Sequence, residues 1–413
     1  MMNEQKLVPE LRFPEFIEGW NPSKLGSIAR FSKGKGISKA DIKEDGNQPC
    51  IRYGELYTTY NELIDDVVSY TDIDQGELVL SEENDVIIPA SGESNIDIAT
   101  AACVRNAEIA LGSDLNIIKT KLDGVFLSYY LNSHLKYKVA SYAQGNSVVH
   151  LYSTQLKLLD LNVPSFDEQQ KIASFLTAVD QRIALLEKKK ALLEQYKKGV
   201  MQKIFPSTGS GQVPEIRFKD ENGNDFEAWE ENKLGEVTKK VSRKNKEGIK
   251  YPVYSINNEI GFLPQSEQFD GLDSNSRGFD ISMYKIVESQ TFAYNPARIN
   301  VGSIGYSYNL GSVIISSLYV CFKTTTELED IYLLQVLETS RFKFDITRFE
   351  EGGVRQYLFY DNFSKIKIPI PSLEEQNHIS SFIEVINRRL KTLSRLIETN
   401  ISFKKGLLQK MFV

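Results

Sequence analysis

The sequence predicts an α/β protein with a pseudo-twofold repeat, in which two mixed α/β domains are joined by two long helices that form an antiparallel coiled coil. A block at 164–205 returns 207 positions later, at 371–412, without insertion or deletion. Apolar residues inside both copies recur at the alternating three- and four-residue spacing of a heptad seam. The segments between the copies share few residues, which indicates a constant scaffold that carries two divergent domains.

The first domain is expected to span residues 1–163. It opens with the motif Val8–Phe13, followed by Trp20 and by Lys24-Leu25-Gly26. Short apolar runs predict strands, and a longer apolar pattern predicts a helix. The strands are Leu78–Leu80, Val86–Ile88 and Asn116–Lys119, and the helix is Gly124–Ser141.

The first long helix is expected within 164–206 and the second within 371–413. Ser165 and Ser372 can open these helices, since serine accepts hydrogen bonds from the first turn. A narrow seam on a helix of about 58 Å requires a partner, and the simplest partner is the other copy. The alternative is that each helix folds back on its own domain. The predicted seam consists of Ile172, Leu176, Val179, Ile183, Leu186, Leu193, Val200 and Ile204, and of Ile379, Ile383, Ile386, Leu390, Leu393, Ile397, Leu407 and Met411.

Between the first helix and the second domain, the composition of residues 207–212 predicts a flexible linker. The second domain is expected to span 213–370. Its opening repeats the first, with Val213–Phe218, Trp229 and Lys233-Leu234-Gly235. We predict strands at Lys250–Ser255, Thr291–Tyr294, Ser312–Ile315 and Leu318–Phe322, and a helix at Leu328–Phe344.

Bulk composition favours an ordinary globular protein of the cytoplasm. The 413 residues are 41% hydrophobic and 25% charged, without an apolar run long enough to predict a membrane span. Three widely spaced cysteines fit a reducing compartment. The net charge of −6 argues against a nucleic-acid partner, although only the local field matters for phosphate contacts. The basic block at 239–250 is either a solvated loop or such a local field.

No catalytic constellation is recognisable in the sequence. His134, His150 and His378 lack metal-ligand spacing. The run Gly34–Ser38 lacks the full phosphate-loop pattern. The run Asn295–Arg298 lacks the second proline and the aromatic residue of an adenine-methyltransferase signature. We therefore expect a chain that is not an enzyme and that holds no metal.

Two divergent domains alternating with two nearly identical heptad helices resemble the specificity subunit of type I restriction–modification enzymes. The resemblance covers essentially the whole chain. It is carried most specifically by Pro164–Gln170 with Lys203-Ile204-Phe205, by their second copies, and by the two opening motifs. It implies two target-recognition domains, each reading half of a split double-stranded DNA site. It also implies that the helices separate these domains and dock two modification (methyltransferase) subunits.

The resemblance further implies that restriction subunits join the full complex. S-adenosylmethionine and ATP would bind the partner subunits, and this chain would hold no cofactor. Because the two domains differ, the DNA site should be asymmetric. Two other functions stay open from the sequence: a self-contained nuclease or methyltransferase, and a coiled-coil scaffold that joins protein partners without DNA specificity.

Specific readout requires side chains that pair with base edges, and phosphate contacts require cations and hydroxyls. Three loops at equivalent places in the repeat meet this need: 33–39 with 243–246, 91–95 with 298–302, and 144–150 with 352–357. Any single residue among them is also compatible with an ordinary surface role. The predicted DNA-binding residues are Lys33, Lys35, Lys39, Ser91, Ser94, Asn95, Gln144, Asn146 and His150 in the first domain, and Arg243, Lys244, Lys246, Asn257, Asn258, Arg298, Asn300, Arg355, Gln356 and Tyr357 in the second.

The exposed faces of the helices are candidates for partner docking, although charged faces on coiled coils are usually solvated. These residues are Lys188, Lys189, Gln195 and Lys198, and Arg388, Arg389, Arg395 and Lys405.

Overall fold

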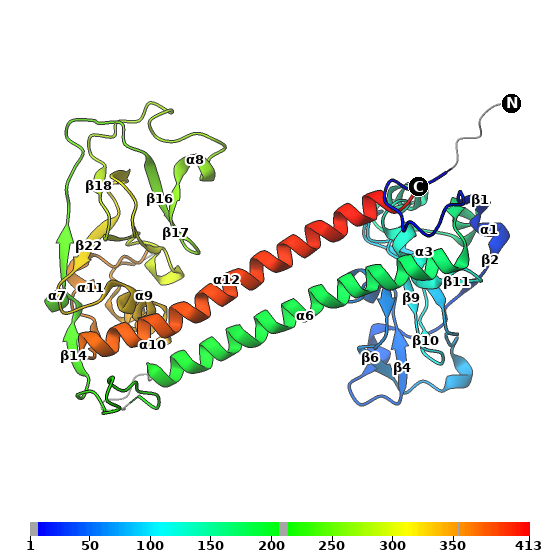
Figure 1. Ribbon diagram of the computed structural model, residues 1–413, viewed down its shortest axis with the longest axis horizontal. Helices are drawn as coiled ribbons and strands as arrows, with labels where there is room; N and C mark the ends of the chain where they lie inside the picture. Colours follow the sequence, from blue (N-terminus) through cyan, green and yellow to red (C-terminus); the bar gives the residue numbers. More distant parts are fainter. Residues whose placement is uncertain (1–6, 206–213, 354) are drawn as a thin grey trace. The chain divides into compact units, whose positions relative to one another are not determined.

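A computed structural model describes residues 7–205, 214–353 and 355–413 of the chain (Figure 1). The chain divides into two compact units. Unit 1 comprises Met1–Lys188 and Leu393–Val413, and unit 2 comprises Lys189–Thr392. Each unit therefore contains one mixed α/β body and a segment of both long helices. The predicted linker at 207–212 lies outside the described residues.

Unit 1 is built on two main sheets with a helical layer (Figure 1). The five-stranded sheet has the order β2 (Ala29–Lys33), β11 (Leu115–Thr120), β7 (Asp85–Pro89), β9 (Ala102–Val104) and β5 (Leu63–Ile64). The four-stranded sheet has the order β10 (Ala110–Leu111), β4 (Gln48–Ile51), β6 (Ser69–Thr71) and β3 (Ile42–Lys43). Two strand pairs complete the unit: β1 (Asn21–Lys24) with β13 (Asp160–Val163), and β8 (Ser91–Gly92) with β12 (Val149–His150). Its short helices are α1 (Leu25–Ile28), α2 (Glu55–Thr58), α3 (Gly124–Asn132), α4 (Lys136–Tyr142) and α5 (Ser153–Leu156).

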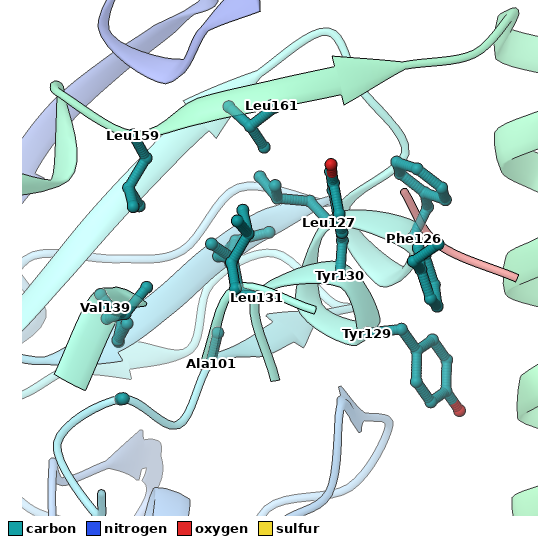
Figure 2. Packing of buried hydrophobic residues seen from close by; sticks show 14 of the residues in the cluster. Ala101, Phe126, Leu127, Tyr129, Tyr130, Leu131, Val139, Leu159 and Leu161 are labelled. Atoms are coloured by element: carbon teal, nitrogen blue, oxygen red, sulfur yellow. The ribbon is translucent and has the colours of Figure 1, made fainter. Parts of the chain in front are cut away.

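The main core of unit 1 lies between α3 and its neighbours. Phe126, Leu127, Tyr130 and Leu131 of α3 point into this core, as Figure 2 shows. Tyr129, on the same helix, is also nearly inaccessible to solvent. Burial of so many large side chains is the main source of stability for the unit.

Two of the three predicted strands of unit 1 are present, because 86–88 lies within β7 and 116–119 within β11. The third prediction, Leu78–Leu80, is wrong: only Leu80 forms an isolated bridge, to Ala110. The predicted helix 124–141 is broken into α3 and α4. The break lies at Ser133, whose φ and ψ angles of −109° and −85° leave the helical region. Beside it, the Asn132 side chain bonds both the N–H and the C=O of Ala101, at 2.7 and 2.8 Å.

Unit 2 is also built on two main sheets, each of four strands. One sheet has the order β15 (Thr238–Val241), β22 (Val320–Thr324), β19 (Phe292–Tyr294) and β20 (Ile304–Tyr306). The other has the order β17 (Gly261–Pro264), β16 (Val253–Asn257), β21 (Val313–Ile315) and β18 (Lys285–Val287), and β14 (Glu230–Lys233) pairs with β23 (Lys367–Ile370). Its short helices are α7 (Leu234–Val237), α8 (Gln265–Gln268), α9 (Asp330–Glu338), α10 (Ser340–Phe349) and α11 (Tyr360–Phe363).

All four strands predicted in unit 2 overlap observed ones, namely β16, β19, β21 and β22. The predicted helix 328–344 is again two helices, α9 and α10. Thr339 separates them: its backbone is extended, and its hydroxyl accepts a hydrogen bond from the Phe342 N–H at 3.2 Å. An N-cap residue of this kind starts a new helix rather than continuing the old one.

The strand pairings show that the repeat includes the divergent bodies. In unit 1, β10 runs parallel to β4 with Ala110 opposite Cys50; in unit 2, β21 runs parallel to β16 with Ile314 opposite Val253. The antiparallel pairs β2–β11 and β15–β22 also correspond. The topology of the body is therefore shared although few residues are.

The long helices are α6 (Phe166–Ile204) and α12 (Leu373–Lys410). Ser165 precedes α6, and its hydroxyl accepts from the Glu168 N–H at 3.4 Å. Ser372 does the same for Glu375 at 3.3 Å. Both serines thus open their helices, as the sequence predicts.

The ends of the predicted seam are buried, but its middle is less so. In unit 1, Ile172, Leu176 and Val179 share a core with Leu407 and Met411. In unit 2, Val200 and Ile204 share a core with Ile379 and Ile383. Ile386 and Leu393 are also buried. The remaining seam residues are only partly buried: Ile183, Leu186, Leu193, Leu390 and Ile397.

The heptad pattern is interrupted at Lys190, Lys197, Asn400 and Lys404. Two of these lysines bind carboxylates of residues far away in the sequence. In unit 1, Lys404 lies 2.8 Å from the Asp180 carboxylate and 3.1 Å from that of Glu62. In unit 2, Lys197 lies 2.8 Å from Glu338. Each of these two charges is therefore paired where an apolar seam residue would otherwise stand.

None of the described helices is long and apolar enough to cross a membrane.

Candidate nucleic-acid interface

The repeated helix starts serve to fix each body to its long helix. In unit 1, the buried Glu168 accepts two hydrogen bonds from the Arg12 guanidinium at 2.7 Å and one from the Trp20 indole at 3.2 Å. In unit 2, Glu375 accepts from Arg217 at 3.0 and 2.6 Å and from Trp229 at 2.8 Å. We call these two groups the Arg–Glu–Trp clamps. They explain why the opening motif, the tryptophan and the helix start repeat together.

The glutamine after each clamp glutamate extends the connection. The side chain of Gln169 accepts from the Asp123 N–H at 2.9 Å, at the start of α3. The side chain of Gln376 accepts from the Glu329 N–H at 2.8 Å, at the start of α9. Both glutamines are buried. The most conspicuous repeated motif therefore has internal partners and is not available to a ligand.

The helix ends also dock on the bodies. Phe412, after α12, stacks on Tyr130 of unit 1 with ring centroids 5.3 Å apart. Phe205, after α6, packs against Tyr332 of unit 2 at 5.7 Å. Helix α6 therefore starts in unit 1 and ends in unit 2, whereas α12 starts in unit 2 and ends in unit 1.

A tight hairpin projects from each body at an equivalent place. Gln144 and His150 exchange backbone hydrogen bonds of 2.9 and 2.7 Å in unit 1. Glu351 and Tyr357 exchange two of 2.8 Å in unit 2. The φ angles of Gly145 and Gly352 are +128° and +134°. A Cβ on either glycine would lie 2.1 Å from a carbonyl oxygen across the hairpin, so only glycine fits.

The hairpins bring two of the three predicted loops together in each unit. In unit 1, the Ser91 hydroxyl and His150 Nδ1 are 3.1 Å apart, and Leu151 N–H donates to Ala90 C=O at 3.0 Å. In unit 2, Leu358 N–H donates to Pro296 C=O at 2.9 Å, next to the loop that carries Arg298. The loops 91–95 and 144–150 thus meet, as do the loops around 298 and 352–357.

Each hairpin base carries a stacked pair of rings. His150 and Tyr152 have centroids 6.2 Å apart in unit 1, and Tyr357 and Phe359 have centroids 5.6 Å apart in unit 2. Tyr152 is 44% exposed and Phe359 is 52% exposed. The amine of Lys33 lies 5.9 Å from the Tyr152 ring, which brings the third predicted loop of unit 1 to the same place. Sequence reasoning missed Tyr152 and Phe359, although their equivalent spacing from Gly145 and Gly352 was a usable signal.

An open cavity of about 600 Å³ lies beside the carboxyl ends of β4 and β10 in unit 1. We call it cavity 1. Arg52 and Tyr53 follow β4, while Ser113 and Asp114 lie between β10 and β11. Lys39 also lines it, from the first predicted loop. The remaining lining residues are Gly36, Ile37, Ser38, Asp41 and Gly54.

A second open cavity, of about 380 Å³, occupies the equivalent place in unit 2 beside β16 and β21. We call it cavity 2. Arg277 and Arg298 supply its positive charge, and Gln268 and Asn295 supply amides. Its other lining residues are Ser255, Ile256, Gln265, Phe269, Ser274, Phe279, Tyr284, Ser316 and Tyr319. Cavity 1 sets Lys39 and Arg52 against the carboxylates of Asp41 and Asp114, whereas the charged residues that line cavity 2 are both arginines. Two concave surfaces at equivalent places, with different side chains and different charge, are suited to read two different targets.

The predicted binding residues are mostly accessible. Ser91 is buried, and Ser94, His150, Asn257 and Tyr357 are partly buried. The exposed ones are Lys33, Lys35, Lys39, Asn95, Gln144, Asn146, Arg243, Lys244, Lys246, Asn258, Arg298, Asn300, Arg355 and Gln356.

Several of the predicted residues have partners within the chain. Ser94 donates to Asp97 at 2.6 Å, and the Asn257 side chain accepts from the Glu259 N–H at 2.8 Å. Arg243 pairs with Glu288 at 2.8 Å, beside β18. The segment 243–246 lies at the end of a strand, as 33–39 does in unit 1. Unlike 33–39, however, it does not line the cavity of its unit.

Sequence reasoning missed the main polar residues of both cavities, Arg52 and Arg277. Neither lies in a basic run, and only the fold places them beside the predicted loops. Among the described residues, no group of three or more His, Cys, Asp and Glu side chains is arranged to hold a metal ion. Burial lowers the pKa of Lys285, whose amine donates to the Tyr319 carbonyl in the wall of cavity 2.

Comparisons with known sequences identify relatives. The chain is 29% identical over 290 residues to the putative type I restriction enzyme MjaX specificity subunit of Methanocaldococcus jannaschii, covering 68% of this chain and 63% of that protein. This match spans less than two thirds of that relative. The chain is also 24% identical over 412 residues to the MjaVIII specificity subunit of the same organism, covering 94% and 88%.

Two solved structures share the fold. The S subunit of a type I restriction-modification system from M. genitalium has a TM-score of 0.61 at 16% identity, covering 98% of this chain and 99% of that one. A chain from a structure on complex assembly and conformational transition of the type I R-M system has a TM-score of 0.52 at 15% identity, covering 96% and 98%.

The family model described as "Type I restriction modification DNA specificity domain" matches residues 17–195 and 227–399. These matches include both bodies with their cavities and most of both long helices. The chain therefore belongs to the type I restriction modification DNA specificity family.

Proposed function

We propose that this chain is the non-catalytic DNA-recognition subunit of a cytoplasmic type I restriction–modification complex, and that it reads an asymmetric, bipartite double-stranded site. The observation that carries the proposal is the pair of equivalent cavities. Cavity 1 offers Lys39 and Arg52 beside the carboxylates of Asp41 and Asp114, whereas cavity 2 offers Arg277 and Arg298. Cations and amides on a concave surface are the groups that bind phosphates and base edges.

The hairpins support the same interface. Gln144, Asn146 and Arg355 are exposed on hairpins that the fold holds by backbone hydrogen bonds. A hairpin fixed in this way can position a side chain toward DNA at low entropic cost. Phosphate contacts along such loops would set the orientation, and the cavity residues would set the sequence.

We further propose that α6 and α12 form an antiparallel coiled coil that sets the distance between the half-sites. Within unit 1, early residues of α6 share a core with late residues of α12, and Asp180 binds Lys404. Within unit 2, late residues of α6 share a core with early residues of α12. Lengthening both helices by one or two heptads should change the spacer of the DNA site, because each heptad adds about 10 Å. An unchanged spacer in methylation mapping contradicts this ruler role.

The exposed helix faces are proposed docking surfaces for two modification subunits, with restriction subunits joining the full complex. Lys188, Lys189, Arg388 and Arg389 are all exposed there. S-adenosylmethionine and ATP would bind the partner subunits rather than this chain. Calorimetry with the isolated chain should show no S-adenosylmethionine binding, and tight binding would instead support a self-contained methyltransferase.

The decisive experiment is to express the chain with its modification subunits and map the methylated sites by sequencing. The expected result is one asymmetric bipartite motif. Lys39→Ala should then alter only the half-site that unit 1 reads, and Arg298→Ala only the half-site that unit 2 reads. Binding to DNA without sequence preference, with the modification subunits present, would favour a protein scaffold instead.

A further inference from the structure

Arg277 is an exposed arginine held between two aromatic rings. Its guanidinium carbon lies 4.7 Å from the centre of the Phe269 ring and 5.4 Å from that of Phe279. All three residues line cavity 2. Aromatic faces attract a cation and limit the rotation of its plane, so this guanidinium is oriented before any ligand arrives.

The backbone around Arg277 is also fixed. Its N–H donates to the Asp273 carbonyl at 3.0 Å, and the Asp273 carboxylate accepts from the Ser276 N–H at 2.8 Å. Ser274, in the same turn, connects the turn to the cavity wall. Its hydroxyl donates to the Gln265 side chain at 2.8 Å and shares a hydrogen bond of 2.9 Å with the Tyr284 hydroxyl. The arginine therefore stands on an anchored turn.

The charge of Arg277 has no carboxylate partner in the part of the chain that the structure describes. The one hydrogen bond that its guanidinium makes there is a long one, from Nε to the Asp273 carbonyl at 3.4 Å. By contrast, Arg243 of the same unit binds Glu288, and Arg341 binds Glu231. The two terminal nitrogens of Arg277 thus keep their N–H donors free on a fixed plane.

The surroundings narrow the kind of ligand. Arg298 lines the same cavity and adds a second cation. The side-chain oxygen of Asn295 accepts from the Ala297 N–H at 3.0 Å, and its side-chain N–H groups have no partner among the described residues. Both guanidinium groups and this amide are therefore hydrogen-bond donors at the cavity. A ligand with adjacent acceptors satisfies them, and guanine presents two acceptors, O6 and N7, on its major-groove edge.

We propose that Arg277 reads a guanine in the half-site recognised by unit 2, through paired hydrogen bonds to O6 and N7, with Phe269 and Phe279 fixing its plane. This inference rests on the proposed DNA-recognition function. It names the residue that determines specificity at one position of the site.

The test is to express wild-type chain, Arg277→Lys and Arg277→Ala with the modification subunits and to map methylated sites in the host genome. Both variants should lose the requirement for one G·C pair in one half-site and keep the other half-site unchanged. The motif should therefore become degenerate at one position, which a misfolded chain cannot produce. In binding assays, affinity for the wild-type site should fall about tenfold to a hundredfold.

Arg348→Ala is the matched control, because Arg348 is also an exposed arginine of unit 2 beside an aromatic ring, that of Phe344 at 5.9 Å, but does not line cavity 2. It should leave the motif unchanged.

Three results would overturn the inference while leaving the proposed function intact. One is a wild-type bipartite motif without a guanine in either strand of the unit 2 half-site. The second is an Arg277→Ala variant that keeps the full motif. The third is an Arg277→Lys variant that keeps the motif, since a lysine replaces a phosphate contact but not a two-donor fork. A wild-type chain that directs methylation to no bipartite motif would instead overturn the proposed function itself.

Discussion

The two cavities lie at the same place in the repeated fold but hold their arginines differently. In cavity 1, Arg52 is fixed by Glu55 at 3.1 Å, and the buried Glu55 also accepts from the Ser69 hydroxyl at 2.6 Å. In cavity 2, Arg277 is fixed by two aromatic rings, and its charge has no carboxylate partner among the described residues. This difference indicates that the strands determine where each cavity lies, whereas the loops determine which side chains line it.

The clamps show the opposite behaviour. Glu168 and Glu375 bind an arginine and a tryptophan in nearly the same geometry, although the bodies around them share few residues. The contacts at the helix starts repeat between the two units, whereas those in the cavities differ. A common scaffold with two separate specificities requires this combination.

The largest expected effect comes from breaking a clamp. Glu375→Ala removes a fully buried carboxylate and leaves the Arg217 guanidinium without its anion. We expect the free energy of unfolding of unit 2 to fall by about 3–5 kcal/mol. Glu168→Ala should cost unit 1 a similar amount. Urea unfolding followed by fluorescence of Trp20 and Trp229 would report both units.

Glu398→Ala is the control for the clamps, because this glutamate is exposed on the same helix as Glu375. It should change stability by less than about 0.5 kcal/mol. A clamp variant that unfolds like this control would show that the repeated motif does not hold the bodies in place.

The second prediction concerns the seam lysines, where the units differ. Lys404→Ala leaves Asp180 and Glu62 close together in a site where their side chains are 19% and 13% exposed. We expect a loss of about 2–4 kcal/mol. Lys197→Ala should cost less than about 1 kcal/mol, because its partner Glu338 is 53% exposed. If both variants lost the same free energy of unfolding in thermal or urea denaturation, the predicted difference between the two lysines would be wrong.

The Lys404 contribution should also have a defined pH dependence. Burial lowers the pKa of Lys404, but the carboxylates of Glu62 and Asp180 outweigh burial, so the pKa lies above its ordinary 10.5. A cation with a raised folded pKa stabilises the protein below its unfolded pKa and loses this effect as pH rises through the folded value. The difference between wild type and Lys404→Ala should therefore be full at neutral pH and shrink only above about pH 10.5.

An effect smaller than the loss of Lys404 separates the two cavities directly. Arg52→Ala leaves the buried Glu55 without its cation, so the free energy of unfolding should fall by about 1–3 kcal/mol. Arg277→Ala removes only contacts with two rings and should cost less than about 1 kcal/mol. Unfolding curves of both variants are the measurement. An Arg277→Ala variant that is the less stable of the two would contradict the view that Arg277 is held ready for a ligand.

Much of the fold followed from patterns within short stretches. The long helices were predictable because Ile172, Leu176 and Val179 repeat with a local period, and Ser165 marks a local start. Strands such as β7 and β11 were predictable from apolar runs. The breaks after α3 and α9 were not, because Ser133 and Thr339, where the backbone leaves the helix, both lie inside a continuous helical pattern of the sequence.

The candidate site divides in the same way. The hairpin glycines Gly145 and Gly352 could be aligned from sequence, and their positive φ angles follow from the same turn. Arg52 and Arg277 could not be singled out, since nothing in their neighbouring residues distinguishes them from other surface arginines.

By itself the sequence determined the repeat, the long helices and the resemblance to a specificity subunit, because these depend on residue identity and local period. Only the tertiary structure decided what the repeated motifs do and where the cavities lie. Glu168 meets Arg12 across 156 positions of chain, and Arg298 lines a cavity with Phe269 and Arg277 from a separate loop. Such contacts depend on how strands pair and pack, so no local sequence pattern predicts them.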